Sequence, residues 1–125
     1  MTPFGEAMRD LRRSKGVSQK QMAEALGVSP AYLSALEHGN RSAPSFEFIQ
    51  RVAGYFNIIW DDLEDLMRVA GLSHPRVVID TAGLGAPYTA LANRLSQEIR
   101  LLDPIDIEEI ESVLDRVAAK ARNEP

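Results

Sequence analysis

Cysteine is absent from the 125-residue sequence, and histidine occurs only twice. Without cysteine the chain can form no disulfide, no thiolate zinc site and no cysteine nucleophile. The two histidines, His38 and His74, are too few and too isolated to predict a zinc site. No apolar run approaches the about 20 residues of a membrane span, and the first residues lack the basic and apolar regions of a secretory signal. These absences predict a cytoplasmic protein with no metal or other cofactor and no membrane partner.

The sequence also lacks the usual signatures of an enzyme. Serine, histidine and aspartate occur, but without the spacing of a nucleophile elbow or a catalytic triad. The acidic cluster Asp61, Asp62, Glu64 and Asp65 has neither the spacing nor the glycine of a calcium-binding loop, and is typical of a solvated helix face. We therefore expect a protein that is not an enzyme.

Basic residues are fewer than acidic residues, and the two kinds are distributed unevenly along the chain. The net charge of −4 counts by itself against a nucleic-acid partner. Residues 1–57 carry seven basic and five acidic residues, a net charge of +2, whereas residues 58–125 carry seven basic and thirteen acidic residues, a net charge of −6. Opposite signs in the two halves suggest two different tasks, although acidic helices that are merely solvated would give the same split.

Signals for the beginnings and ends of helices dominate the first 70 residues. Ser18, Ser29 and Ser45 stand where N-caps are expected, and Gly16, Gly27 and Gly39 stand where helices end. Together with the apolar spacing they predict five helices, at 4–15, 18–26, 29–38, 45–56 and 60–70. The spacing places these side chains of the last two helices inward: Phe46, Ile49, Val52, Ala53, Phe56, Trp60, Leu63, Met67 and Ala70.

The pattern changes beyond Gly71. Residues 73–75 are typical of a linker, and Arg76–Asp80 contains the only β-like run of the chain. Two further helices are predicted, the second beginning at Asp103 and Pro104. Their apolar stripes are Tyr88, Leu91, Leu95, Ile99 and Leu102, and Ile107, Ile110, Leu114, Val117 and Ala121. The predicted fold class is all-α, with five helices, a short extended segment and a two-helix C-terminal region.

The segment from Gln19 to Gly39 has the residues that two helices joined by a tight turn require. Ala23 is small enough for close approach of the second helix, and Gly27, four residues later, tolerates the positive φ of the turn. Leu33 and Leu36, three residues apart, would press into the seam that Met22, Leu26 and Val28 form on the first helix.

These residues, in the run VSQKQMAEALGVSPAYLSALEHG from Val17 to Gly39, resemble the lambda-repressor-like (Cro/XRE) helix-turn-helix family of transcriptional regulators. The resemblance extends over about residues 4–70, including the Pro44-Ser45 helix start and the later Asp61-Asp62-Leu63 helix. One departure is Ile59, where the family often has a serine cap, and it concerns the helix start alone. The resemblance implies a DNA-binding domain at 1–72, and the apolar stripes beyond it predict a helical dimerisation or regulatory region at 73–125.

The resemblance also implies which residues meet DNA. The helix Ser29–His38 would enter the major groove, with its first residues toward the base edges. None of the reading positions holds Gln, Asn or Arg, so we expect thymine-methyl contacts from Ala31, Ala35 and the Tyr32 ring. The full set of expected DNA-binding residues is Gln19, Lys20, Ser29, Pro30, Ala31, Tyr32, Ser34, Ala35, Asn40, Arg41 and Ser42, with Gln19, Lys20, Asn40, Arg41 and Ser42 at phosphates. Arg12 and Glu37 match positions that form an internal ion pair in the family.

We therefore expect a sequence-specific regulator, a repressor, that binds a palindromic operator as a homodimer, because one reading domain contacts only one half-site. The expected dimerisation residues are Val77, Val78, Ile79, Leu91, Leu95, Ile99, Ile110, Leu114 and Val117. Arg76–Asp80 could pair antiparallel with its copy as a ribbon, and the helix stripes could instead close a hairpin within one chain. Two alternatives remain: an antitoxin that autoregulates its operator and holds a basic toxin with its acidic C-terminal half, and a repressor that binds an inhibitor protein through residues 73–125.

Overall fold

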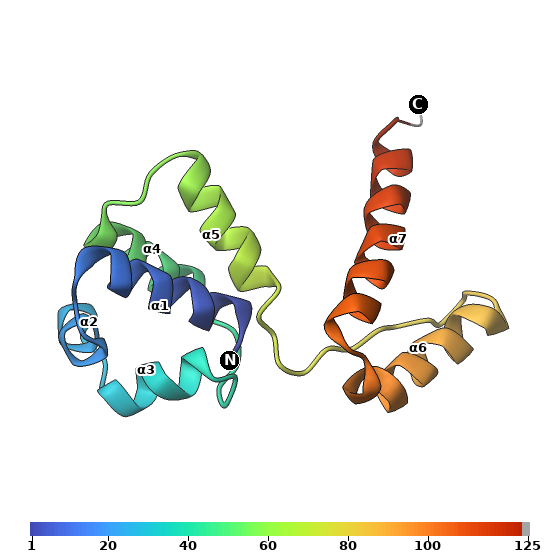
Figure 1. Ribbon diagram of the computed structural model, residues 1–125, viewed down its shortest axis with the longest axis horizontal. Coiled ribbons are helices and arrows are strands. Elements are labelled where there is room, and N and C mark those ends of the chain that lie inside the picture. The colour runs from blue at the N-terminus through green and yellow to red at the C-terminus, as the bar shows by residue number, and fades with distance from the viewer. Residues whose placement is uncertain (124–125) are drawn as a thin grey trace. The chain divides into compact units, whose positions relative to one another are not determined.

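The computed structural model describes residues 1–123, and within them the regular structure is helical throughout (Figure 1). The all-α class predicted from the sequence is confirmed. The elements are α1 (Pro3–Lys15), α2 (Gln19–Leu26), α3 (Pro30–Glu37), α4 (Phe46–Phe56), α5 (Asp61–Gly71), α6 (Ala86–Glu98), the 3-10 helix η1 (Ile99–Leu101) and α7 (Pro104–Asn123). The chain divides into two compact units, Met1–Val77 and a second that begins at Val78. No helix in the described part of the chain is both long enough and apolar enough to cross a membrane.

Side-chain caps begin the first four helices, three of them at the serines that the sequence predicts. The side chains of Thr2, Ser18, Ser29 and Ser45 each accept a hydrogen bond from the backbone N–H three residues later. Ser18 is part of a reciprocal capping box, because the Gln21 side chain accepts from the backbone N–H of Ser18 in return. These bonds satisfy donors that have no partner within the helix, so the starts of the helices are determined by local sequence.

One apolar core holds the first unit together. In it α1 packs against α3 and α5, α2 packs against α3 and α4, and α4 packs against α5. The ring of Phe48 lies edge-on to that of Phe4, with centroids 6.4 Å apart, in the favoured geometry of aromatic pairs. The most deeply buried apolar side chains come from all of the first four helices: Phe4, Met8, Met22, Ala23, Leu33 and Val52.

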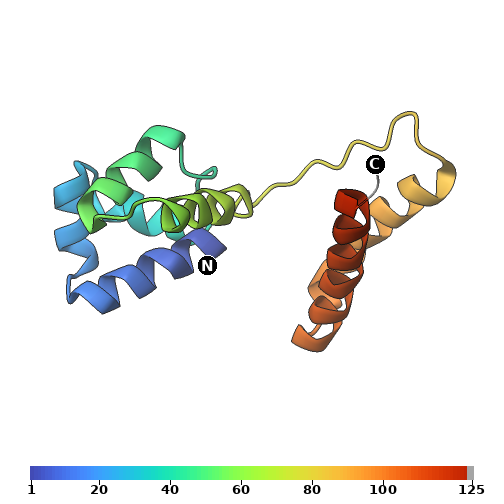
Figure 2. The same ribbon diagram turned by 90° about the horizontal axis from the view of Figure 1, so that it is seen from above.

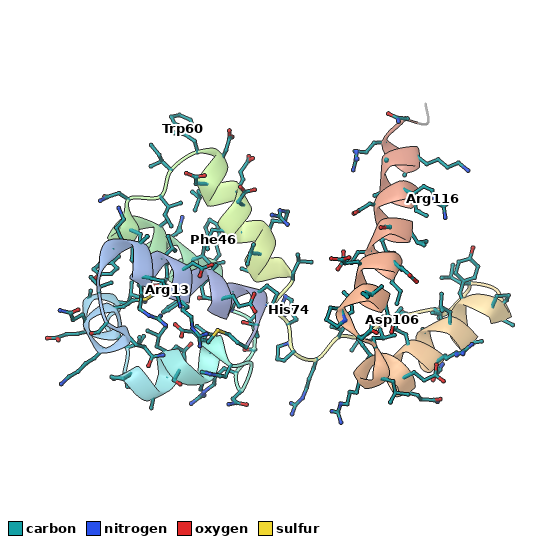
Figure 3. The ribbon with its side chains drawn as sticks, in the orientation of Figure 1. Arg13, Phe46, Trp60, His74, Asp106 and Arg116 are labelled. Carbon is teal, nitrogen blue, oxygen red and sulfur yellow. The ribbon has the colours of Figure 1, made fainter. Side chains whose placement is uncertain are left out.

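Three side chains predicted to point inward do not. Phe46 is 58% exposed and Met67 is 40% exposed, while Trp60 is 82% exposed and extends away from the start of α5 (Figure 3). Phe48 and Leu66 occupy the core instead. In α4 the rest of the predicted stripe, Ile49, Val52, Ala53 and Phe56, is buried as the spacing predicts, whereas in α5 the inward stripe lies one step round from the predicted one. Packing against neighbouring helices decides which of two overlapping apolar faces is covered.

The second unit contains α6, η1 and α7, and none of these helices has a buried residue. In Figure 1, α6 and α7 form an open V that meets at η1. A reciprocal cap begins α7, since Asp106 N–H donates to Asp103 and Asp103 N–H donates to Asp106. Figure 2 shows the irregular segment from α5 to α6, in which residues 77–80 are neither helix nor strand and are exposed. Hydrogen bonding within each helix therefore defines this unit better than packing does.

Candidate nucleic-acid interface

Helices α2 and α3 meet through a tight turn. Gly27 has a φ of +73°, which only glycine adopts at little cost, and its N–H bonds to the Glu24 carbonyl at 3.2 Å. The next residue, Val28, donates to the Ala23 carbonyl at 3.0 Å. Ala23 itself is fully buried, so the small side chain allows α3 to approach α2 closely. The arrangement is a helix-turn-helix.

The two sides of α3 differ sharply in exposure. Leu33, Leu36 and Glu37 are buried and attach the helix to the core. The other side consists of the residues expected to read bases: Ser29, Pro30 and Ala31 are exposed, and Tyr32, Ser34 and Ala35 are partly exposed. The Ser29 hydroxyl already accepts from the N–H of Tyr32 at 3.0 Å. The outer side of α3 thus offers small and apolar groups with three hydroxyls, those of Ser29, Tyr32 and Ser34, and no amide or guanidinium.

The ring of Tyr32 is held from two directions. Its edge-on partner in the core is Phe48, with centroids 6.4 Å apart. The guanidinium carbon of Arg41, in the loop after α3, lies 5.4 Å from the Tyr32 ring centroid, within cation–π range. A ring positioned in this way gives up little conformational freedom when a ligand arrives. The spacing of the sequence does not pair Tyr32 with Phe48, so sequence analysis alone does not identify Phe48 as the residue that supports the Tyr32 ring.

Arg12 and Glu37 form an ion pair between α1 and the end of α3. The Arg12 Nη2 atom donates to Glu37 Oε1 at 3.0 Å, and a second short bond joins Nη1 to Oε2. The Glu37 side chain is fully buried and that of Arg12 is 11% exposed. Gln19, expected at a phosphate, donates its side-chain amide to Glu37 Oε1 at 3.1 Å. This three-residue network ties the start of α2 to the end of α3.

The end of α3 is also anchored to the first turn of α1. The backbone N–H of Thr2 donates to the Glu37 carbonyl at 2.9 Å. Gly5 lies so close to that carbonyl that a Cβ added there would be 2.2 Å from its oxygen. The approach requires glycine because the obstacle is backbone, which cannot move aside as a flexible side chain can.

The remaining residues expected at phosphates are exposed. Lys20 lies at the start of α2, while Asn40, Arg41 and Ser42 follow the end of α3. The loop residues share a pocket of about 380 Å³ with His74, Pro75 and Arg76 from the segment after α5 (His74 is labelled in Figure 3). The sequence gives no local signal for this proximity, because more than 30 residues separate the two segments.

Comparison with known proteins agrees with this geometry. The family model described as helix-turn-helix matches residues 8–63. The chain is 35% identical over 71 residues to the uncharacterized HTH-type transcriptional regulator RghRB of Bacillus subtilis, which is 57% of this chain and 49% of that protein. It is 42% identical over 60 residues to YazB of the same organism, covering 48% of this chain and 86% of YazB.

A third relative is the HTH-type transcriptional regulator SinR of Bacillus subtilis, which is 32% identical over 55 residues, or 44% of this chain and 50% of SinR. The chain spans about half the length of RghRB and of SinR. No solved structure matches.

Proposed function

The chain belongs to the lambda-repressor-like (Cro/XRE) helix-turn-helix family of transcriptional regulators, and on this premise we propose that it is a repressor that binds a palindromic DNA operator as a homodimer. In this proposal residues 1–72 form the five-helix reading domain, and residues 73–125 form the two-helix dimerisation region. The observation that carries the proposal is the division of α3 into a buried side and an outer side. Leu33, Leu36 and Glu37 hold the helix, and its other side remains accessible to a DNA groove.

The outer side of α3 supports recognition through thymine methyl groups. Ala31 and Ala35 present methyl groups, and the Tyr32 ring is held beside them. Apolar contact with the C5-methyl group distinguishes thymine in the major groove, whereas adenine and guanine are read best by side chains that this helix lacks. Ser34 adds one hydroxyl that can donate to, or accept from, a base edge.

Contacts to the DNA backbone would come from both ends of the helix-turn-helix. Lys20 and Arg41 supply positive charge, and Asn40 and Ser42 supply neutral donors, all on exposed positions. Gln19 has one amide hydrogen committed to Glu37, so it would reach a phosphate with its backbone N–H or its other amide hydrogen. Such contacts provide affinity and register without sequence information.

The second unit supports self-association. Its apolar stripes include Leu91, Ile99, Leu114 and Val117, each more than half exposed, and none of its helices buries a residue. Helices of this length gain most of their stability from covering an apolar face, so these need a partner. Exposure of both stripes favours association between two chains over closure of a hairpin within one chain. The residues proposed to form the dimer are Val77, Val78, Ile79, Leu91, Leu95, Ile99, Ile110, Leu114 and Val117.

The segment Arg76–Asp80 is proposed to pair antiparallel with its own copy in that dimer. Val78 is 91% exposed, and its β-branched neighbours Val77 and Ile79 favour extended backbone. A two-fold axis would supply the missing strand from the same five residues of the second chain. The ribbon would then help to set the spacing of the two recognition helices at about 34 Å, one turn of DNA.

Selection of bound sequences from a random DNA pool tests the proposal. We expect enrichment of a palindrome whose half-sites are about 10 base pairs apart, or a multiple of that distance. The variant Ala35→Glu, which places a carboxylate on the outer side of α3, should abolish the enrichment. Gln50→Glu, which adds the same charge on an exposed position of α4, should not. Enrichment of single, unrepeated sites would contradict the dimer, and no enrichment would contradict the function.

A second candidate function rests on the charge of the second half. Residues 58–125 have a net charge of −6 beside exposed apolar stripes, a combination suited to a basic partner protein. In this alternative the chain is an antitoxin that autoregulates its operator and holds a toxin through its C-terminal half. A neighbouring open reading frame for a small basic protein that copurifies with the chain would favour it.

A further inference from the structure

A pocket of about 380 Å³ lies at the end of α3, within the first unit. One wall is the loop after α3 and the other is the segment that leaves α5. The lining residues are Gly39, Asn40, Arg41, Ser42, His74, Pro75 and Arg76. The first wall contains three of the residues expected at phosphates, whereas the second wall lies outside the helix-turn-helix and is not part of that expectation.

Hydrogen bonds to the first turn of α1 hold both walls in place. The Ser73 hydroxyl, nearly fully buried, accepts from Phe4 N–H at 2.9 Å and donates to the Val69 carbonyl at 2.7 Å. This fixes the direction in which the chain leaves α5. On the other side, the Thr2 N–H holds the carbonyl of Glu37, two residues before Gly39. The pocket is therefore a built feature of the first unit.

Gly39 allows the two walls to approach each other. Its φ is +79°, and a Cβ added there would lie 3.2 Å from the Thr2 methyl group and 3.6 Å from Pro75 Cβ. Pro75 thus closes over the loop after α3, with His74 and Arg76 as its neighbours in the chain.

The chemistry of the pocket is that of an anion site. Its lining includes two guanidinium groups, from Arg41 and Arg76, and donors from Asn40, Ser42 and His74, but no carboxylate. Within residues 1–123 neither arginine forms an ion pair. Guanidinium groups bind phosphate oxygens through paired N–H donors, and they are weakly hydrated, so transfer to a phosphate costs them little.

We propose that this pocket binds a phosphate of the DNA backbone, with Arg76 as a DNA contact supplied by the segment after α5. The inference rests on the proposed function and extends it beyond the helix-turn-helix. DNA is favoured over a free phosphate because Arg41 also lies against Tyr32 on α3. A phosphate in the pocket is thereby placed beside the residues that face the bases, where the backbone bordering the groove runs. His74 adds an imidazole N–H donor to the same phosphate.

The first experiment measures DNA affinity of the full chain against salt concentration. Each neutralised phosphate contributes about 0.9 to the slope of log affinity against log salt. We expect Arg76→Ala to lower the slope by about 0.9 and to weaken binding about eightfold at about 0.1 M salt, on operator and random DNA alike. Arg76→Lys keeps the charge and should keep the slope. The matched control is Arg68→Ala, since Arg68 is an exposed arginine of α5 that faces Asp65 outside the pocket.

The second experiment locates the phosphate. Each backbone position of the selected site is replaced in turn by an uncharged methylphosphonate. One position in each half-site should weaken Arg76→Ala less than it weakens the wild type, because the variant has already lost one of the two guanidinium groups at that phosphate. Equal losses for Arg76→Ala and the wild type at every position would overturn the inference.

The outcomes separate this inference from the function on which it rests. Wild-type protein that fails to bind any DNA overturns both. Wild-type protein that binds, with Arg76→Ala indistinguishable from Arg68→Ala, overturns only the inference. A third arm titrates inorganic phosphate into the protein without DNA. Phosphate binding that Arg76→Ala removes while the salt slope with DNA stays unchanged would assign the pocket to a free anion and overturn the backbone contact.

Discussion

Both units of this chain consist of helices with apolar stripes, but the stripes are buried in the first unit and exposed in the second. In the first, apolar stripes of five helices converge, and Phe4, Met8 and Val52 lose all contact with solvent. In the second, α6 and α7 have stripes of similar composition, but none of their residues is buried. Helical periodicity alone does not distinguish the two cases, because it shows that a helix has an apolar face and not what covers that face. The difference separates a unit whose apolar faces cover one another from a unit whose apolar faces stay exposed, and in our proposal a second chain covers the latter.

The largest expected effect tests how far the first unit depends on its internal ion pair. Glu37→Ala should lower the free energy of unfolding by about 3–5 kcal/mol, because it leaves the nearly buried guanidinium of Arg12 without its partner. Thermal or denaturant unfolding measures this change. Glu47→Ala is the control, since its bond to Arg51 is exposed and should be worth less than about 1 kcal/mol. An unchanged midpoint for Glu37→Ala would place the pair effectively in solvent.

The same leucine-to-alanine truncation, made once in each unit, tests the comparison between the buried and the exposed stripes. Leu33→Ala removes a fully buried side chain and should cost about 2–5 kcal/mol of stability at any protein concentration. Leu114→Ala, on the exposed stripe of α7, should leave the unfolding of the first unit unchanged and weaken the dimer. Sedimentation and melting at two concentrations would show both effects. A Leu114→Ala defect that is the same at all concentrations would mean that the second unit closes within one chain.

A smaller effect is expected in the segment between the units. Val78→Pro removes an N–H that the proposed ribbon needs, at a cost of about 1–3 kcal/mol per subunit. It should shift the dimer towards monomer and lower operator affinity, while the first unit stays folded. Val78→Thr keeps both the N–H and the β-branched shape, and should behave as wild type. An intact dimer for Val78→Pro in sedimentation would eliminate the ribbon and leave the helices as the dimer contact.

The smallest effect concerns the exposed apolar surface on the outer side of α3. Replacing thymine by uracil removes one methyl group, and should cost about 1 kcal/mol at each position that Ala31, Ala35 or Tyr32 contacts. Tyr32→Ala should abolish the difference between thymine and uracil at its own position. If uracil is neutral at every position, the site is read by DNA shape and not by methyl contact.

The sequence predicts what is local in this structure. The starts of α2, α3 and α4 follow from Ser18, Ser29 and Ser45, because a cap bonds to a backbone group only three residues away. The turn at Gly27 follows in the same way, since a positive φ there excludes most other residues.

What the sequence does not predict depends on distant partners. Helical spacing predicts Trp60 and Met67 in the core, yet Leu66 is buried in their place on α5, the helix that packs against α1 and α4. The Phe48 ring under Tyr32 and the amide of Gln19 on Glu37 join residues 16 and 18 positions apart. No short pattern encodes such contacts, since they exist only after five helices have been assembled.

The Ser73 hydroxyl has a mechanical consequence. Tension on the chain beyond α5 would reach that helix through this residue, whose hydroxyl bonds to Phe4 N–H and to the Val69 carbonyl. The load is therefore shared between the beginning of one helix and the end of another, and α5 is not peeled away turn by turn. Because Thr2 in turn holds the carbonyl of Glu37, part of any pull is delivered to the end of α3. Ser73 would thus distribute a pull over α1 and α5, and residues beyond the first unit, from Val78 on, could lengthen or shorten without loosening the helix-turn-helix.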